Sequence, residues 1–134
     1  MIDPSVRGDL FRNGLEAEGA QKWDGAIDFF RKAFIDAGIK EKAIILFRIG
    51  TCFHNQGKLD EALGSYKESL ELAKEMKDKE GEAVNLCNIG IVYYDKGELD
   101  KALSYYEQAL KIAQDIGNKQ AEAKIGRASC RERV

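Results

Sequence analysis

The feature that most constrains the fold of this chain is an internal repeat with a period of 40 residues. When the sequence is shifted by 40 positions, the segment Ala43–Met76 aligns with Ala83–Ile116, and 12 of the 34 positions are identical. Ordinary residue frequencies would give roughly two identities. A shift of 36 recovers a weaker copy upstream, with apolar, glycine and acidic residues in the same order. Self-similarity at such a period indicates a stack of small supersecondary units.

The spacing inside each copy is helical. In the middle copy two sets of residues each follow the spacing of one helix face: Leu46, Ile49, Gly50 and Phe53, and then Ala62, Tyr66, Leu70 and Ala73. Between the two sets, Gly57 can end the first helix in a left-handed conformation. Asp60 can cap the second helix, as Asp24 and Asp100 can in the other copies. Each copy is therefore predicted to be two antiparallel helices joined by a tight turn.

The small residues predict how the two helices of a pair approach each other. Gly50 and Ala62 are expected at the helix crossing, where a large side chain would force the helices apart. Larger residues such as Phe53 and Tyr66 then fill the space on either side. One pair cannot bury this apolar surface alone, so the pairs are expected to stack.

Composition and charge limit the class of function. Of the 134 residues 44% are hydrophobic and 33% are charged, which suits one folded domain rather than a disordered chain. A net charge of −2 argues against binding to nucleic acid or an anionic membrane. The longest apolar run, Ala43–Phe47, is too short to span a membrane, and the charged N-terminus is unlike a secretory signal. Three scattered cysteines fit a reducing compartment, so we expect a cytoplasmic protein.

The recurring residues resemble the tetratricopeptide repeat. The middle copy reads Leu46-x2-Ile49-Gly50-x2-Phe53 and then Ala62-x3-Tyr66, and the last copy matches better, with Leu86-x2-Ile89-Gly90-x2-Tyr93 and then Ala102-x3-Tyr106. The resemblance implies an all-α fold, a right-handed superhelical solenoid of antiparallel helix pairs. It covers three repeats over approximately residues 5–38, 40–77 and 80–116. The period exceeds the usual 34 residues, and the proline that commonly closes a repeat is missing.

Members of this family bind partners on a concave face lined by the first helix of each pair. By the resemblance, that face here carries Phe11, Phe47, Arg48, Thr51, His54, Asn55, Val84, Cys87, Asn88, Ile91, Tyr94 and Asp95. Such a partly apolar wall suits an extended or helical peptide with apolar anchors. The Asn88 amide can bond a peptide backbone, and Arg48 can meet a carboxylate. For the apolar residues of the face, packing against the next helix layer is an equally open interpretation, and His54 is expected to be a solvated helix residue.

Neither catalysis nor metal binding is indicated. The chain has a single histidine, so a two-histidine zinc motif is impossible within it. Cys52 and His54 are two residues apart on one helix and face apart, so they cannot pair as nucleophile and base. Cys52 and Cys87 are instead expected to be small packing residues. The sequence therefore predicts a protein that is not an enzyme and needs no cofactor or metal.

One family scheme does not fit the chain. The clamp that holds the C-terminal carboxylate of chaperones requires lysine, asparagine and arginine at defined places of three repeats. Those places hold Phe11, Leu15, Arg48, Val84 and Asn88 here. A chaperone tail is therefore not the expected ligand.

The C-terminal residues depart from the repeat. Residues 117–124 begin like another first helix, and then the pattern stops. Residues 125–134 resemble the conceptual translation of a common sequencing-adapter oligonucleotide. We expect this segment to be a non-native tail and the array to be truncated, the alternative being a genuine basic tail on a capping helix.

These observations predict a non-enzymatic adaptor that binds a peptide or protein partner in its concave groove. An alternative is a regulatory sensor segment of a larger signalling protein with a kinase, cyclase or DNA-binding domain. A further possibility is self-association through an exposed end of the solenoid.

Overall fold

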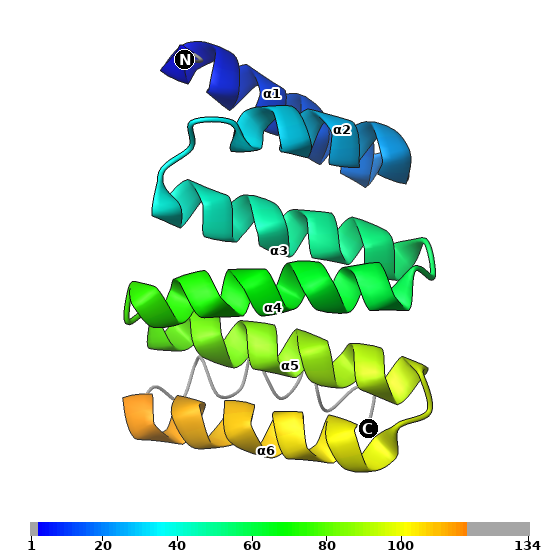
Figure 1. Ribbon diagram of the computed structural model, residues 1–134, viewed down its shortest axis with the longest axis vertical. Coiled ribbons are helices and arrows are strands. Elements are labelled where there is room, and N and C mark those ends of the chain that lie inside the picture. The colour runs from blue at the N-terminus through cyan, green and yellow to red at the C-terminus, as the bar shows by residue number, and fades with distance from the viewer. Residues whose placement is uncertain (1–2, 118–134) are drawn as a thin grey trace. The chain divides into compact units, whose positions relative to one another are not determined.

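The computed structural model describes residues 3–117, which form six α-helices and no strand (Figure 1). In chain order the helices are α1 (Pro4–Gly19), α2 (Trp23–Phe34), α3 (Ile39–Asn55), α4 (Leu59–Glu75), α5 (Lys79–Asp95) and α6 (Leu99–Ile116). The predicted all-α class is therefore confirmed. The chain divides into two compact units, 1–69 and 70–134, with the boundary inside α4.

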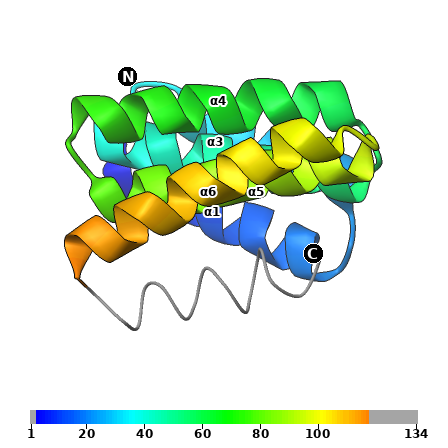
Figure 2. The same ribbon diagram turned by 90° about the horizontal axis from the view of Figure 1, so that it is seen from below.

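The helices are arranged as antiparallel pairs within these units. In the first unit α1 packs against α2, and α3 lies beside α4 in both views (Figures 1 and 2). In the second unit α5 packs against α6 along its length. Each pair joins a first and a second helix of one copy of the sequence repeat.

A glycine facing an aromatic ring sets the approach of the helices in every pair. A β-carbon placed on Gly50 would lie 2.8 Å from the ring of Tyr66, and one placed on Gly90 would lie 2.7 Å from the ring of Tyr106. Both distances are closer than real β-carbons come to other atoms. Glycine at these positions therefore lets the ring lie directly against the first helix.

The weak first copy keeps the same contact. A β-carbon on Gly14 would lie 2.5 Å from the Phe30 ring, and Phe30 is fully buried. Ala62, the small residue expected near the crossing, is fully buried, and so is Ala26 at the equivalent position of the first copy. The pairing rule predicted from Gly50 therefore extends to the copy whose sequence matches least.

The turn inside each pair is the same in all three copies. Gly57 and Gly97 adopt left-handed backbone angles, with φ of +78° and +83°, as predicted for Gly57. Gln21 stands at the equivalent place of the first copy with φ of +59°. In each case the next amide donates back to a carbonyl five residues earlier, as Lys58 does to Phe53 at 2.9 Å. This hydrogen bond marks a Schellman motif that ends the first helix.

The prediction that an aspartate caps the second helix of each pair is wrong. Asp24, Asp60 and Asp100 each lie inside the first turn of their helix rather than at its N-cap. The N-cap residues of α2 and α6 are Lys22 and Glu98, and neither makes a side-chain capping bond. The reason is geometric. The residue whose amide completes the Schellman motif, Lys22 or Glu98, is also the N-cap of the next helix, so the aspartate comes too late to cap it. The aspartates still place negative charge near a helix N-terminus, where the helix dipole favours it.

The core of the first unit lies between α2 and α3. Ile27, Phe30, Ile45, Ile49 and Cys52 are at most 5% exposed and belong to one buried cluster. The Ser69 hydroxyl of α4 is also buried and donates to the Ala43 carbonyl oxygen of α3 at 2.8 Å. These contacts hold the helices that carry the predicted binding face.

The predictions for the C-terminus fall almost wholly outside the described residues. Gly117 follows α6 with φ of +68°, and the rest of the predicted further helix and the predicted tail over 125–134 are not described. Within residues 3–117, no helix is long and apolar enough to cross a membrane.

Candidate functional site

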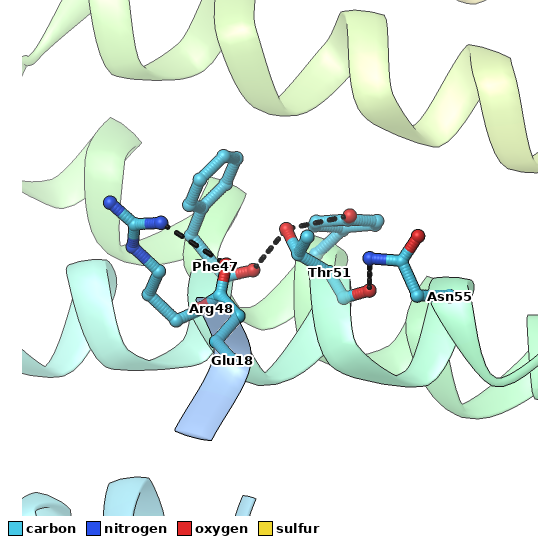
Figure 3. Close-up of polar contacts among 6 residues, drawn as sticks. Glu18, Phe47, Arg48, Thr51 and Asn55 are labelled. Atoms are coloured by element: carbon cyan, nitrogen blue, oxygen red, sulfur yellow. Dashed lines mark hydrogen bonds and ion pairs between the residues drawn. The ribbon is translucent and has the colours of Figure 1, made fainter. Parts of the chain in front are cut away.

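The predicted binding face begins on α1 and α3 in the first unit. Arg48 of α3 donates through Nη1 to Glu18 Oε2 of α1 at 3.3 Å (Figure 3). The Arg48 side chain is 39% exposed, whereas that of Glu18 is only 17% exposed. Arg48, predicted to meet a carboxylate of a ligand, therefore meets one from its own chain. The ion pair joins the two first helices of this unit and leaves part of the guanidinium open to solvent.

Two other predicted face residues contact the second helix of their own pair. The Phe47 ring lies 5.9 Å from the Tyr66 ring between centroids. The Thr51 hydroxyl donates to the Phe47 carbonyl oxygen and lies 3.1 Å from the Tyr66 hydroxyl (Figure 3). Because Tyr66 is the ring that covers Gly50, Phe47 and Thr51 contribute to the packing of α3 on α4. For these two residues the packing interpretation has direct support.

The C-terminal end of α3 carries the polar residues of the predicted binding face. Asn55 is exposed, and its side-chain amide donates to the Thr51 carbonyl oxygen at 3.0 Å. His54 is half-buried. These residues form the solvated end of the face on this helix.

Phe11, the predicted face residue on α1, lines an apolar pocket. The cavity has a volume of about 370 Å³ and is lined by Pro4, Arg7, Gly8 and Phe11 of α1 and by Glu41, Ile44 and Ile45 of α3. The Phe11 ring is held by the Phe30 ring, with 5.5 Å between centroids. A volume of this size lies in the range of small-ligand and side-chain pockets.

In the second unit the predicted face lies on α5. Cys87 and Ile91 are almost fully buried, at 0% and 4% exposure. Val84 and Asn88 are half-buried, while Tyr94 is 39% exposed and Asp95 is exposed. The α5 stripe therefore runs from buried apolar residues to an accessible tyrosine and carboxylate.

The cysteine of α3 is unsuited to nucleophilic chemistry. Cys52 is a fully buried free thiol, and burial raises its pKa to about 12, with a further rise from the nearby Glu18 carboxylate. Nucleophilic cysteines need a lowered pKa and access to substrate. Among residues 3–117, no three histidine, cysteine, aspartate or glutamate side chains come together as a metal site requires.

The pocket between α1 and α3 was not predicted from the sequence, although the repeat contains a signal for it. The shifts of 36 and 40 residues place Gly8 at the position that Ile44 and Val84 occupy in the other copies. A glycine in place of a branched aliphatic residue leaves space beside the helix. The other copies give no comparable indication of a role for Arg7 or Glu41. The positions equivalent to Arg7 hold alanine, and those equivalent to Glu41 hold serine and glycine.

Comparison with protein families gives one match. The family model of the tetratricopeptide repeat matches residues 41–115, which is more than half of the chain. No curated protein matches the sequence.

Solved structures of several repeat proteins are similar in fold. A crystal structure of MamA aligns with a TM-score of 0.73 at 20% identity, covering 86% of this chain and 63% of that one. The Rap conjugation gene regulator of the plasmid pLS20, in complex with the Phr* peptide, gives 0.77 at 21% identity and covers 87% and 34%. PcrH, in complex with the chaperone binding region of PopB, gives 0.74 at 23% identity and covers 93% and 95%. The chain thus spans 63% of the MamA chain and 34% of the Rap chain.

Proposed function

The chain belongs to the tetratricopeptide repeat family, a fold that generally serves protein interaction rather than catalysis, and on this premise we propose that it is a non-enzymatic adaptor. It binds a peptide or protein segment on the face formed by the first helix of each pair. The first unit offers the predicted residues of α1 and α3 for this, and the second unit offers those of α5.

The surface of α1 and α3 is the observation that carries the proposal. An apolar pocket lined by Phe11 and Ile44 lies on the same two helices as a partly exposed ion pair between Arg48 and Glu18. Peptide-binding sites typically combine apolar anchor pockets with a few orienting polar groups. The two first helices of the first unit provide both.

The α5 stripe supplies groups suited to a polypeptide partner. Asn88 is half-buried, and its amide has both donors and an acceptor for a peptide backbone. Tyr94 is 39% exposed, and tyrosine combines a large apolar ring with a polar tip, which is why it is enriched at interfaces. Asp95 adds an exposed carboxylate.

Proteins of similar fold support a polypeptide ligand. The Rap regulator was solved with a peptide, and PcrH with a region of another protein. Both ligands are stretches of polypeptide, which is the class of partner proposed for this chain.

A regulatory sensor segment is the second candidate. The similarity to the Rap conjugation gene regulator, which was solved with a peptide, supports it. In this case the same face binds the signal, and an output domain belongs to the same gene. Sequencing the full-length gene separates the two candidates, since a kinase, cyclase or DNA-binding domain would identify the sensor.

The location of the binding face can be tested by site-specific photo-crosslinking. A photoreactive phenylalanine replaces Tyr94 on α5 and, as the control, exposed Glu107 on α6. In lysate of the source cell, the Tyr94 position is expected to crosslink one or a few proteins that the Glu107 position does not. Equal crosslinking from both positions, or none from Tyr94, would overturn the proposal.

The Asn88→Ala variant then tests the role of the amide with the partner so identified. Stability should change little, because Asn88 is only half-buried, while affinity falls by roughly 5- to 100-fold if a peptide hydrogen bond is lost. Gln114→Ala, an exposed amide on α6, is the matched control and should bind normally. Unfolding of the Asn88 variant would make this residue structural and place the groove elsewhere.

A further inference from the structure

The pocket between α1 and α3 lies at a position where the first repeat has no side chain. Gly8 occupies the position that Ile44 holds in the second copy and Val84 in the third. A β-carbon built on Gly8 meets no other atom within 4 Å, so the space beside this glycine is open. The cavity of about 370 Å³ is therefore the room that a branched aliphatic side chain would partly fill.

The walls of the pocket are held by contacts outside it. The Phe11 ring packs on the buried Phe30 ring, and Ile45 is only 2% exposed within the core of the first unit. Ile44, by contrast, is 44% exposed and also lines the pocket. A large apolar side chain with this exposure, next to a fixed apolar wall, offers surface that a ligand can bury.

The charged side chains of the pocket are one arginine and one glutamate. Arg7 donates through Nη2 to the Asp36 carbonyl oxygen at 2.9 Å, and its Nε is buried without a hydrogen-bond acceptor among residues 3–117. Glu41 also lines the pocket, but its carboxylate turns back toward Gly38, the N-cap residue of its own helix. There the helix N-terminus offsets its negative charge. Arg7 is therefore the charged group left to pair with a ligand.

We propose that this pocket is the anchor site for one bulky apolar side chain of the partner, of leucine or phenylalanine size, followed closely by a carboxylate that Arg7 binds. The inference rests on the proposed function, because Phe11 and Ile44 lie on the same helices as the proposed binding face. It adds the chemistry of the partner segment: an apolar anchor next to an acidic group.

The probe for this proposal is 4-phenylbutyrate, which carries an aromatic ring and a carboxylate on one short chain. With isoleucine methyl groups labelled for NMR, titration is expected to shift the signals of Ile44 and Ile45 in a saturable way. The signal of Ile89, which is fully buried in the second unit, serves as the internal reference and should stay in place. The amine 4-phenylbutylamine, which reverses the charge, is expected to bind at least fivefold more weakly.

Filling the pocket provides the decisive variant. Gly8→Val restores the residue type of the other copies without a clash and should abolish the shifts while keeping the melting temperature. Gly64→Val, at an equally open glycine on α4, is the matched control and should bind like the parent. Arg7→Met should bind the acid and the amine equally. Undiminished binding by the Gly8 variant, or equal binding of acid and amine by the parent, would overturn the proposal.

Failure of the pocket and failure of the proposed function are distinguishable. If 4-phenylbutyrate leaves Ile44 and Ile45 unmoved while the Tyr94 crosslink still captures a partner, the anchor site is wrong and the adaptor function stands. If the probe binds as expected but no partner crosslinks, the pocket is a ligand site and the proposed adaptor function is wrong.

Discussion

The two units use the same packing rule but differ at the positions around it. In the first unit Gly14 faces Phe30, and in the second Gly90 faces Tyr106, so a glycine and a ring define the helix pair in both. The surrounding positions differ. Gly8, Gln21, Arg48 and Cys52 in the first unit correspond to Val84, Gly97, Asn88 and Val92 in the second.

The comparison of equivalent positions in the two units shows which residue types the fold requires and which positions can vary. The glycine–aromatic contact recurs in the copy with the weakest sequence match, because without it the helices cannot approach closely enough to bury their faces. The varied positions each exchange ordinary packing for another property: a pocket, a strained turn, an ion pair or a buried thiol. Replacing residues of one unit with those of the other tests this division.

The largest effect is expected at the shared contact. Gly14→Leu and Gly90→Leu each force a side chain into a ring, and each should destabilise its pair by about 3 kcal/mol, measured by urea unfolding. Gly64→Leu on α4, where a β-carbon meets nothing within 4 Å, should cost much less. If Gly14→Leu proves harmless while Gly90→Leu unfolds the chain, the packing rule does not hold in the first copy.

The next effect depends on pH and concerns Cys52. Burial raises the thiol pKa from 9.0 to about 12 in the folded chain, so the unfolded chain loses this proton first as the pH rises. The stability linked to the thiol is therefore complete below about pH 9 and falls by about 1.4 kcal/mol per unit up to about pH 12. Cys52→Val, which installs the residue of the second unit, should lack this fall.

The comparison is made by unfolding both proteins at pH 8 and pH 10. Tyrosine and lysine groups titrate in both proteins, so the difference between them isolates the thiol. If the parent and the variant lose stability in parallel, the Cys52 thiol ionises in the folded chain with its ordinary pKa. In that case the thiol would be less well buried than its zero exposure indicates.

The pairing of helices could be predicted from sequence because it depends on local spacing and on one small residue. Gly50 indicated the crossing, and Gly57 indicated a left-handed turn, both of which are backbone requirements that few residues satisfy. The capping aspartates were misplaced because their role depends on where the previous helix ends. The Schellman motif brings that end so close that Lys58 directly precedes α4, and its carbonyl oxygen already accepts from the Ala62 amide.

The binding face was harder to predict than the fold. Arg48 and Thr51 were identified as face residues from their register, yet their contacts with Glu18 and Tyr66 come from other helices. A sequence pattern shows which side of a helix a residue lies on, but it does not show which partner lies within reach. The Gly8 pocket required both kinds of information, since the repeat shows the missing side chain and the structure shows the open space.

A smaller effect is expected at the turn of the first copy. Gln21 holds φ of +59° where Gly57 and Gly97 stand in the other copies. Gln21→Gly removes the left-handed strain of a residue with a β-carbon and should stabilise the first unit by about 0.5–1 kcal/mol, seen as a higher melting temperature. Gln21→Ala is the control, because it removes the side chain but keeps the β-carbon. A gain shared by both variants would assign the effect to the glutamine side chain.

The smallest effect concerns the ion pair on the proposed face. Arg48→Asn, which installs the second unit's Asn88, should cost about 0.5 kcal/mol, because Arg48 is 39% exposed and water screens its attraction to Glu18. A double-mutant cycle with Glu18→Gln should give a coupling of similar size that shrinks as salt is added. A coupling several times larger would mean that the pair is chiefly structural and that Arg48 is committed to holding α1 on α3. A small coupling leaves the guanidinium free to exchange Glu18 for a carboxylate of the partner, since little stability is lost when the internal pair opens.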